Sequence, residues 1–374
     1  MEKKYSILQV CVDLDGGGID RYLYNYCTII QDIHFDFAAI DNKNGILEKP
    51  LTQYGYNIYK IPRITQGFIQ NYKALKRVMS SHHYDAVHVH LGFYGFLALL
   101  AAKKCGIKTR IVHAHIAFVP ENYKEKMIRK ILTFVTKRLA TNMAACGIDA
   151  AKWVWGENSY KEGKVIVHNN AINTNLYKFN NDQRIATRKS LGISDETLLV
   201  GHIGRLCDQK NQKRLIEIFY EISKEVDNSK LILLGFKESS YSADLEVLIK
   251  KYSLQDKVFV LGVRDDVHIL LNAMDVFVFP SKFEGLPFTL IETQCNGLYS
   301  LSSSAVSKYV KVSDCLDFLS LNENNKTWAE KAISLSRKGH CENAIKQVVS
   351  AGYDLEVEAS KLKTYYLSLI KKNA

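Results

Sequence analysis

Two glutamates, Glu284 and Glu292, lie eight positions apart in the segment FPSKFEGLPFTLIETQCNGL, residues 279–298. The apolar run before them is typical of a buried strand. From Pro287 the segment is typical of a helix, with proline at an early position and Gly297 as its C-cap. Carboxylates accept hydrogen bonds, so the pair suits neighbouring hydroxyls such as a ribose diol or those of a sugar ring. The alternative, acidic residues that favour a helix start, explains Glu284 fairly well but Glu292 poorly.

Backbone N–H groups near Phe288 and Thr289 would lie at the start of this helix, where anions bind. A second such place is GRLCDQKNQKRL, residues 204–215, where Arg205 follows a strand and Lys210 precedes a helix. Two cations that converge at a helix N-terminus suit a diphosphate that gains charge as it leaves. A solvated basic loop is the alternative interpretation.

Three consecutive glycines, Gly16, Gly17 and Gly18, follow the first predicted strand and precede a helix. Glycines allow a ligand to approach the backbone closely, although a plain tight turn would use them too. They do not form GxGxxG, which weighs against a dinucleotide cofactor and an oxidoreductase. The triplet at residues 13–15 formally matches the DxD metal motif, but such triplets are common by chance, and we expect no metal there.

Four histidines lie in two pairs, His88 with His90 and His113 with His115. Members of each pair are two residues apart, so they share one face of a strand. Such a set could suggest a metal site, yet it lacks a clear acidic or cysteine companion. Core or strand-end histidines are the more frequent explanation.

Strand-like and helical segments alternate along the whole chain, which indicates parallel sheets built from βαβ units. Helical patterns such as residues 211–226 separate the strands. A polar stretch near residues 178–196 suggests a boundary between two Rossmann-like domains, whose strand ends carry the sites above. We predict an N-terminal domain at 1–180, a C-terminal domain at 181–354 and a final helix at 355–374. The predicted strands are 5–14, 35–41, 57–62, 85–91, 109–116, 142–146, 164–169, 198–206, 231–236, 258–263, 276–281 and 299–304.

The composition is that of a globular protein, with 47% apolar and 24% charged residues among 374. Its 8 cysteines are scattered singly, which indicates reduced thiols in a cytosolic protein. The N-terminus is typical of a first strand rather than a signal peptide. The longest apolar run, residues 93–102, has about half the length that a membrane span requires.

Charge is unevenly distributed. Residues 1–180 hold 24 Lys and Arg against 14 Asp and Glu, whereas residues 181–374 hold 26 against 25. Residues 124–138 form a basic amphipathic helix on which Ile128, Ile131, Leu132, Val135 and Leu139 share one face, and Lys126, Arg129, Lys130 and Lys137 lie opposite. The helix either packs its apolar side on the domain or contacts an anionic membrane surface.

The motifs GGGIDR, GRLCDQKN and FPSKFEGLPFTLIETQCNGL, in this order, resemble the family 4 glycosyltransferases of the GT-B fold. KVIVHNNAINTNLY resembles the segment that leads out of the first domain in this family. KWVWG and FLSLNENNKTWAEKA are similar to its bacterial capsule and exopolysaccharide branch. The resemblance covers nearly the whole chain, and the Glu-x7-Glu block is its most specific part.

The resemblance implies that Arg205 and Lys210 hold the nucleotide diphosphate, that Glu292 holds the ribose, and that Glu284 holds hydroxyls of the donor sugar. Amides near residues 288–289 would bind the phosphates. Gly16 to Gly18 would lie against donor and acceptor, and His115, or alternatively His113, would lie near the transferred sugar. Sugar transfer would proceed with retention and commonly without metal, so we expect no cofactor. The final helix would cross back onto the first domain, and the two domains would face each other across a cleft.

The expected function is therefore transfer of a sugar, from a UDP-sugar by preference, to a lipid-linked or oligosaccharide acceptor of a surface polysaccharide. We expect a cytoplasmic enzyme, peripheral on the inner face of the membrane. Departures from the family pattern at residues 294–299 leave a non-catalytic partner subunit as an alternative. A GT-B sugar-nucleotide epimerase is another. A nucleic-acid-binding protein would explain the charge but not the paired glutamates.

Overall fold

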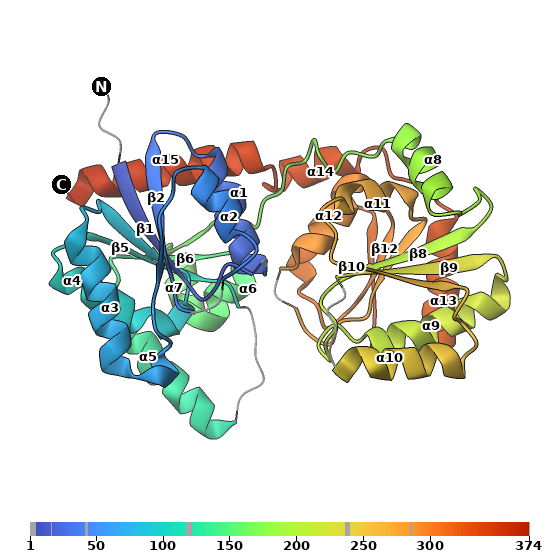
Figure 1. Cartoon of the computed structure of the whole chain (residues 1–374), viewed down its shortest axis with the longest axis horizontal. Helices are drawn as coiled ribbons and strands as arrows, with labels where there is room; N and C mark the ends of the chain where they lie inside the picture. Colours follow the sequence, from blue (N-terminus) through green and yellow to red (C-terminus); the bar gives the residue numbers. More distant parts are fainter. Residues whose placement is uncertain are drawn as a thin grey trace. The chain divides into compact units, whose positions relative to one another are not determined.

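A computed structural model describes residues 5–15, 17–41, 44–116, 122–235, 240–284 and 286–373. These residues belong to two compact units, the first comprising 1–171 with 355–374 and the second comprising 172–354. Each unit has a parallel sheet with helices packed on both of its faces (Figure 1). Strands covered on both faces are apolar along nearly their whole length, which is what segments such as VFVF and LILL show.

The first unit holds a seven-stranded sheet in the order β3-β2-β1-β4-β5-β6-β7. Its strands are β1 (Tyr5–Cys11), β2 (Ile33–Ala39), β3 (Ile58–Lys60), β4 (Ala86–Val89), β5 (Thr109–Ala114), β6 (Asn142–Ala145) and β7 (Val165–Val167). Its helices are α1 (Gly18–Ile29), α2 (Glu48–Gln53), α3 (Phe68–Ser81), α4 (Phe96–Lys104), α5 (Tyr123–Leu139), α6 (Ile148–Ala150), α7 (Glu157–Lys161) and α15 (Leu355–Asn373).

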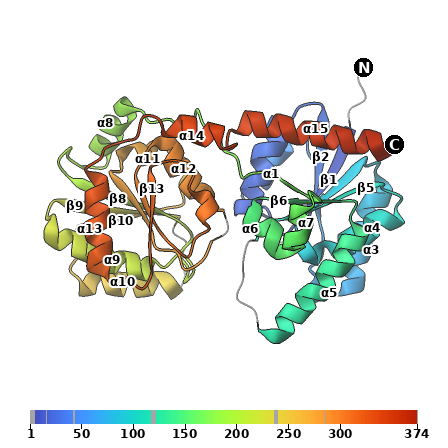
Figure 2. The same ribbon diagram turned by 180° about the vertical axis from the view of Figure 1, so that it is seen from behind.

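Alternate residues of β1 divide this unit into two layers. Leu8 and Val10 join an apolar core with α3 and α4, and burial of such side chains contributes about 1.5–3 kcal/mol each. The opposite face of the sheet is covered by α1 and α15, which pack against each other (Figure 2). Gln9 lies on that opposite face and is 1% exposed. A polar side chain buried this completely requires hydrogen-bond partners.

The second unit holds a six-stranded sheet in the order β10-β9-β8-β11-β12-β13. Helices α9, α10 and α13 cover one face, with Trp328 at 0% exposure in their core. Its strands are β8 (Leu198–Ile203), β9 (Ser229–Leu234), β10 (Val258–Gly262), β11 (Val276–Phe279), β12 (Ser300–Ser303) and β13 (Leu316–Leu319). Its helices are α8 (Asn181–Ser190), α9 (Gln212–Glu225), α10 (Ser240–Lys251), α11 (Val267–Ala273), α12 (Phe288–Asn296), α13 (Asn325–Ser336) and α14 (Ala344–Ser350).

Every predicted strand is present, each within a few residues of its predicted bounds. β13 was not predicted, because LDFL is short and carries an aspartate between its apolar residues. The first unit ends at Ala171 rather than at the predicted residue 180. The segment after it binds the second unit: Ile172 N–H donates to Tyr353 O at 3.0 Å, and Asn180 N–H donates to Asn272 Oδ1 at 3.0 Å.

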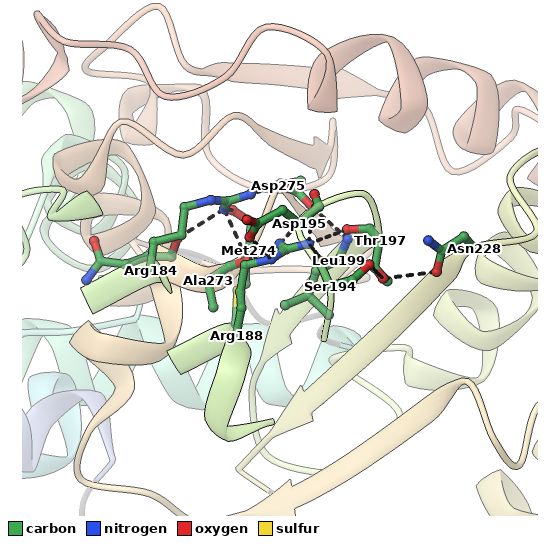
Figure 3. A network of polar contacts seen from close by, with 11 residues as sticks. Arg184, Arg188, Ser194, Asp195, Thr197, Leu199, Asn228, Ala273, Met274 and Asp275 are labelled. Atoms are coloured by element: carbon green, nitrogen blue, oxygen red, sulfur yellow. Dashed lines mark hydrogen bonds and ion pairs between the residues drawn. The ribbon is translucent and has the colours of Figure 1, made fainter. Parts of the chain in front are cut away.

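A buried arginine fixes the starts of β8 and β11 in the second unit (Figure 3). The Arg188 guanidinium donates to Ala273 O at 2.7 Å and to Ser194 O at 2.6 Å, and it lies 3.3 Å from the Asp275 carboxylate. Asp275 in turn accepts from Leu199 N–H at 2.7 Å. Because β8 and β11 are thereby joined at their amino ends, the loops at their carboxyl ends are held beside each other as well.

The predicted apolar face of the helix at 124–138 is partly wrong. Leu132 and Leu139 of α5 do pack against the core of the first unit. Ile128 and Ile131, predicted to share that face, are instead 43% and 58% exposed. The side of α5 that contacts the domain is therefore rotated relative to the prediction.

Two cations predicted to face solvent account for this rotation. Arg129 donates to Trp153 O at 3.2 Å and stacks over the Trp153 ring at 4.8 Å. Lys137 donates to the carbonyl of Trp155 and to Ser159 Oγ. Their aliphatic stems are buried while their charged ends bind carbonyls, which long basic side chains do readily.

Candidate functional site

In both sheets the strand order reverses direction beside the first strand of the unit. The reversal lies between β1 and β4 in the first unit and between β8 and β11 in the second. In open parallel sheets, ligands bind beyond the carboxyl ends of the strands at such a point. The predicted site residues of the second unit follow β8 and β11, and His115 and the glycines of the first unit follow β5 and β1.

Hydrogen bonds join the loop after β8 to the loop after β11. Lys282 N–H donates to Gln209 O at 2.8 Å, and Gln209 Nε2 donates to Phe283 O at 3.0 Å. Asn211 Nδ2 donates to Pro280 O at 3.1 Å. The two loops therefore act as one structural element, although 69 or more residues separate them in the sequence.

Lys210 and Glu284 form an ion pair across these loops, with Nζ 2.6 Å from Oε1. Their side chains are only 15% and 12% exposed, so the pair is screened less than a surface pair would be. The ammonium also lies 4.7 Å from the centre of the Phe279 ring. Arg205, in the same loop as Lys210, is exposed, and its backbone carbonyl accepts from Gln212 Nε2 at 2.8 Å. The structure thus brings together Lys210 and Glu284, two residues that the sequence placed in different motifs.

The helix predicted from Pro287 begins at Phe288, with Pro287 as its N-cap residue. Phe288 and Thr289 are the first helical residues, and amides in a first turn have no partner within their own helix. The helix ends at Gly297, which takes a left-handed φ of 77° as a C-cap. Gly285, in the turn before the helix, lies outside the described residues. The amide donors predicted for a phosphate are therefore at a helix N-terminus, as expected.

Glu292 is 1% exposed within α12, and its Oε1 accepts from the Tyr177 hydroxyl at 2.8 Å. Tyr177 belongs to the first residues of the second unit and was not singled out from the sequence. A ribose at Glu292 would have to replace or accompany this hydroxyl, because the carboxylate is otherwise enclosed. The predicted ribose contact remains a prediction.

Two of the departures from the family pattern have structural roles in the same helix. Gln294 Nε2 donates to Val310 O at 2.8 Å, and its Oε1 accepts from Ser313 N–H at 2.9 Å. Asn296 Nδ2 donates to Tyr177 O at 3.2 Å. These side chains fasten α12 to neighbouring loops at the end opposite to Phe288, and they do not occupy the start of the helix.

The loop after β1 ends in the N-terminus of α1. Gly17 is the N-cap residue, and its N–H donates to Asp20 Oδ2 at 2.8 Å. Gly17 and Gly18 are both exposed, and a Cβ at Gly18 would meet no heavy atom within 4 Å. Gly16 lies outside the described residues. The start of α1 is therefore exposed, and the predicted contact of these glycines with donor and acceptor stays a prediction.

The four histidines of β4 and β5 are brought together on the face of the sheet covered by α1 and α15. The rings of His90 and His115 have centroids 5.2 Å apart, and those of His88 and His113 also lie 5.2 Å apart. Burial lowers the pKa of His115 to about 3 and holds the pKa values of the other three well below their usual range. All four rings are therefore neutral at physiological pH.

Ring nitrogens of His88, His90 and His113 lie within 4.8 Å of one another, a grouping that could hold a metal ion. Each neutral ring has one lone pair to offer, and the hydrogen bonds among the histidines use those of His90 and His113. The residues do not fit an ion without breaking these bonds. That no metal takes part stays a prediction.

A pocket of about 400 Å³ opens at the carboxyl edge of the first sheet. His115 contributes to its wall, together with Arg63, which is paired with Asp41 at 2.5 Å. Most of the lining is apolar, from residues after β1, β2, β4 and β5 such as Val12, Ile40, Leu91 and Ile116. A largely apolar pocket with a cation and a histidine at the switch point is the natural place for a second ligand.

Models of two protein families match the chain. The model described as Glycosyltransferase Family 4 matches residues 17–176, and the model described as Glycosyl transferases group 1 matches residues 183–347. Together the matches span both units and nearly all of the residues discussed above.

Curated relatives match over nearly their full length. The putative glycosyltransferase EpsF of Bacillus subtilis is 26% identical, with 96% of each chain covered. The capsular polysaccharide biosynthesis glycosyltransferase CapH of Staphylococcus aureus is 24% identical, with 97% of this chain and 99% of the relative covered. An Escherichia coli UDP-Gal:alpha-D-GlcNAc-diphosphoundecaprenol alpha-1,3-galactosyltransferase is 23% identical over 95% of this chain and 94% of its own.

Solved structures share the fold. HepE of Anabaena, crystallised with UDP, superposes with a TM-score of 0.81 at 19% identity and covers 97% of this chain and 100% of its own. The sucrose-phosphate synthase of Thermosynechococcus elongatus has a TM-score of 0.74 at 16% identity, with 98% and 100% covered. The predicted GT-B fold, with two Rossmann-like α/β domains, is confirmed.

Proposed function

Because the chain belongs to glycosyltransferase family 4, we propose that it transfers a hexosyl or N-acetylhexosaminyl unit from a UDP-sugar to a lipid-linked or oligosaccharide acceptor. The reaction retains the configuration of the anomeric carbon and serves the synthesis of a bacterial surface polysaccharide. The choice of donor follows the UDP complexes of HepE and the UDP-Gal in the name of the E. coli relative. The choice of acceptor follows the diphosphoundecaprenol in that name and the capsular polysaccharide biosynthesis in the name of CapH.

The observation that carries the proposal is the Lys210–Glu284 pair at the switch point of the second sheet. A cation and an acceptor-only carboxylate 2.6 Å apart match two adjoining parts of a nucleotide-sugar, its diphosphate and its sugar. Lys210, with Arg205, faces the diphosphate, and Glu284 binds hydroxyls of the transferred sugar. On donor binding each partner exchanges its ion pair for a ligand contact, so neither charge is left buried and alone.

The remaining donor contacts come from α12. The amides of Phe288 and Thr289 donate to phosphate oxygens, where the positive end of the helix dipole also favours negative charge. Glu292 accepts from a ribose hydroxyl and shares that role with the Tyr177 hydroxyl. The donor site needs no metal, because Arg205, Lys210 and the helix N-terminus supply the positive charge that a diphosphate requires.

In the proposed step the bond between the anomeric carbon and the diphosphate oxygen breaks, and a bond from an acceptor hydroxyl to the same carbon forms. Retention places both events on one face of the sugar, so the departing diphosphate oxygen is the nearest base for the acceptor proton. Lys210 and Arg205 stabilise the charge that develops on the diphosphate, a contribution typically worth about 10²–10³ in rate.

The acceptor binds to the first unit. Its apolar pocket of about 400 Å³ has Arg63 and His115 in the wall, which suits a sugar carried by a lipid diphosphate. Gly17 and Gly18 at the start of α1 allow the ligand to lie against the backbone. Gly16, which the family resemblance assigns the same role, is included in the proposal on sequence grounds.

The direct test is an assay with UDP-glucose, UDP-galactose and UDP-N-acetylglucosamine, each with a polyprenyl-diphosphate sugar and excess EDTA. The proposal predicts UDP release and a new lipid-linked glycoside with one donor, and an unchanged anomeric configuration by NMR. An inverted product would contradict retention. Neither UDP release nor a glycoside, from every donor and acceptor pair, would instead favour the partner-subunit alternative.

Membrane association is the second part of the proposal and rests on α5. None of the helices formed by the described residues combines the length and apolar character that a membrane span requires. α5 nevertheless exposes an apolar stripe, defined here as Tyr123 (81%), Met127 (41%), Ile131 (58%) and Phe134 (58%). These positions recur at helical spacing, and the exposed cations Lys124, Lys126, Lys130 and Arg138 flank them.

An apolar stripe among cations suits an anionic lipid surface on the cytoplasmic side, with each cation near the surface contributing about 1 kcal/mol. The variant Ile131→Ser/Phe134→Ser should bind vesicles containing phosphatidylglycerol about tenfold more weakly in sedimentation assays. Val247→Ser is the control, since Val247 is an equally exposed apolar residue, 65%, on α10 of the second unit. Equal binding of both variants would contradict the assignment to α5.

A further inference from the structure

A continuous chain of hydrogen bonds runs behind His115 and connects three strands of the first unit with its C-terminal helix. It starts at His115 Nε2, which lies 2.9 Å from His90 Nδ1, and His90 Nε2 lies 2.8 Å from Gln9 Oε1. Gln9 Nε2 then reaches the Tyr366 hydroxyl of α15 at 3.3 Å. From Tyr366 the chain continues to His88 Nδ1 at 2.6 Å, and from His88 Nε2 to His113 Nδ1 at 3.2 Å.

The direction of every bond in this chain follows from the one amide in it. A neutral imidazole has one N–H donor and one acceptor nitrogen, whereas an amide has a carbonyl at one end and an NH₂ at the other. Since the Gln9 carbonyl faces His90, the proton of His90 is on Nε2, and its Nδ1 accepts from His115 Nε2–H. The Nδ1 of His115 is then the nitrogen without a proton.

The other half of the chain is fixed in the same way. Because the Gln9 NH₂ donates to the Tyr366 oxygen, the hydroxyl proton points to His88 Nδ1. His88 must therefore carry its proton on Nε2 and donate it to His113 Nδ1. A rotation of the Gln9 amide by half a turn would reverse all of these bonds together.

Nothing at the far end of the chain opposes such a reversal. The Nε2 atom of His113 is buried and has no hydrogen-bond partner among the residues that the structure describes. The ring of Tyr22 lies 5.1 Å from that of His113. The Tyr22 hydroxyl is also buried and also has no hydrogen-bond partner among the described residues. The chain of hydrogen bonds consequently takes its direction from the Gln9 amide, whose NH₂ faces Tyr366 and whose carbonyl faces His90.

We propose that Gln9 and Tyr366 are positioning residues that set the tautomer of His115, so that this histidine presents a hydrogen-bond acceptor to a ligand hydroxyl in the pocket of the first unit. Gln9 acts through His90, and Tyr366 holds the Gln9 amide in the orientation required. Only one part of this proposal rests on the proposed function, namely that the ligand hydroxyl belongs to a sugar. It makes α15, the last helix of the chain, part of the machinery that prepares the pocket.

The test is NMR of the full chain with ¹⁵N-labelled histidine, in which two-bond couplings identify the protonated ring nitrogen. The wild type should show His88, His90, His113 and His115 as neutral Nε2–H tautomers at neutral pH. Gln9→Met keeps a side chain of similar length but removes both amide contacts. It should release the hydrogen bonds on both sides of Gln9 and turn all four histidines into mixtures of tautomers.

Tyr366→Phe removes only the hydroxyl and keeps the ring packed. It should release the Gln9 amide and mix the tautomers of all four histidines, with Tyr365→Phe as the matched control on the same helix. In transfer assays kcat should fall about tenfold for Gln9→Met and about threefold for Tyr366→Phe, with an unchanged KM for the UDP-sugar.

Three results would overturn the proposal: Nδ1–H or charged His115 in the wild type, variant spectra like those of the wild type, or stoichiometric binding of Zn²⁺ with loss of the histidine hydrogen bonds. The spectra are recorded without substrate, so they stand even if the protein does not transfer sugar. Conversely, loss of transfer with intact tautomers would count against the proposed function alone.

Discussion

The two sheets of this protein reverse their strand order at equivalent places, yet the side chains at the two reversal points have opposite character. In the second unit the point carries charge: Lys210 and Glu284 are paired at 2.6 Å, with Arg205 exposed in the same loop as Lys210. In the first unit it carries neutral rings, since burial lowers the pKa of His115 to about 3. The fold thus supplies the location, and the residues that follow the strands decide which ligand is accepted.

The difference follows from how each unit satisfies the buried polar groups at the carboxyl ends of its strands, here called the first edge and the second edge for the first and second unit. The second unit joins two loops through backbone carbonyls and leaves its charges at the loop tips, where a charged ligand can reach them. The first unit instead places a glutamine and histidines within strands and directly after them, where they bind one another and are too buried to carry charge. A diphosphate suits the former edge, and an uncharged sugar hydroxyl suits the latter.

The largest effect on catalysis is expected when the positive charge of Lys210, at the second edge, is removed. Lys210→Met should lower kcat/KM about 10³-fold, because it removes the cation that faces the diphosphate and leaves Glu284 without its partner. Steady-state kinetics with the UDP-sugar measures this. Lys213→Met is the control, since Lys213 pairs with Asp244 at the surface and should be replaceable with less than twofold change. Similar losses of kcat/KM in both variants would show that the Lys210 charge has no special role at this site.

The next effect concerns stability rather than chemistry. Arg188 is charged and buried in the second unit but lies at the amino ends of β8 and β11, away from the candidate site (Figure 3). Arg188→Ala should destabilise the second unit by about 3 kcal/mol, because the Asp275 carboxylate and several carbonyls lose their donor. Denaturant unfolding measures the loss. An unchanged unfolding midpoint would show that the network does not fix these strands.

Acid should affect the first unit more than the second. Burial lowers the pKa of His168, His202 and His340 to about 4 and the pKa of His115 to about 3. It also holds the pKa values of the other three clustered histidines of the first unit well below their usual range. Since these folded-state pKa values lie below the unfolded value, the unfolded chain binds more protons. The stabilisation is therefore complete above about pH 6.5 and is lost as the pH falls toward about 4.

The two units can be followed separately because Trp153 and Trp155 lie in the first and Trp328 in the second. Thermal unfolding of Trp328→Phe reports the first unit, and Trp153→Phe/Trp155→Phe reports the second. Between about pH 7 and about pH 5 the first should lose roughly 1 kcal/mol for each buried histidine per pH unit, and the second less. Equal losses of unfolding free energy in the two variants would contradict the expectation that acid destabilises the first unit more than the second.

The sequence predicted the fold and the second edge better than the first. Parallel strands and the motifs at residues 204–215 and 279–298 are local patterns, and both loops come together because β8 and β11 are neighbours. Even the pairing of His88 with His90 could be assigned to one strand face. The exposed stripe of α5 was missed, because spacing alone does not say which side of a helix the domain covers.

Gln9 and Tyr366 were missed for a different reason. Their hydrogen bond spans 357 residues, and neither residue stands in a motif that local spacing could reveal. Tyr177, the partner of Glu292, was missed likewise, across 115 residues. A glutamine inside the apolar strand YSILQVC was the one visible signal, because a buried amide demands partners.

Calorimetric titration of UDP and UMP, with EDTA present, measures whether the loops after β8 and β11 bind a nucleoside diphosphate through Lys210. We expect the wild type to bind UDP at least about tenfold more tightly than UMP, and Lys210→Met to bind the two equally. Lys213→Met should behave as the wild type does. No binding of UDP, or a preference for UDP that survives in Lys210→Met, would contradict the account.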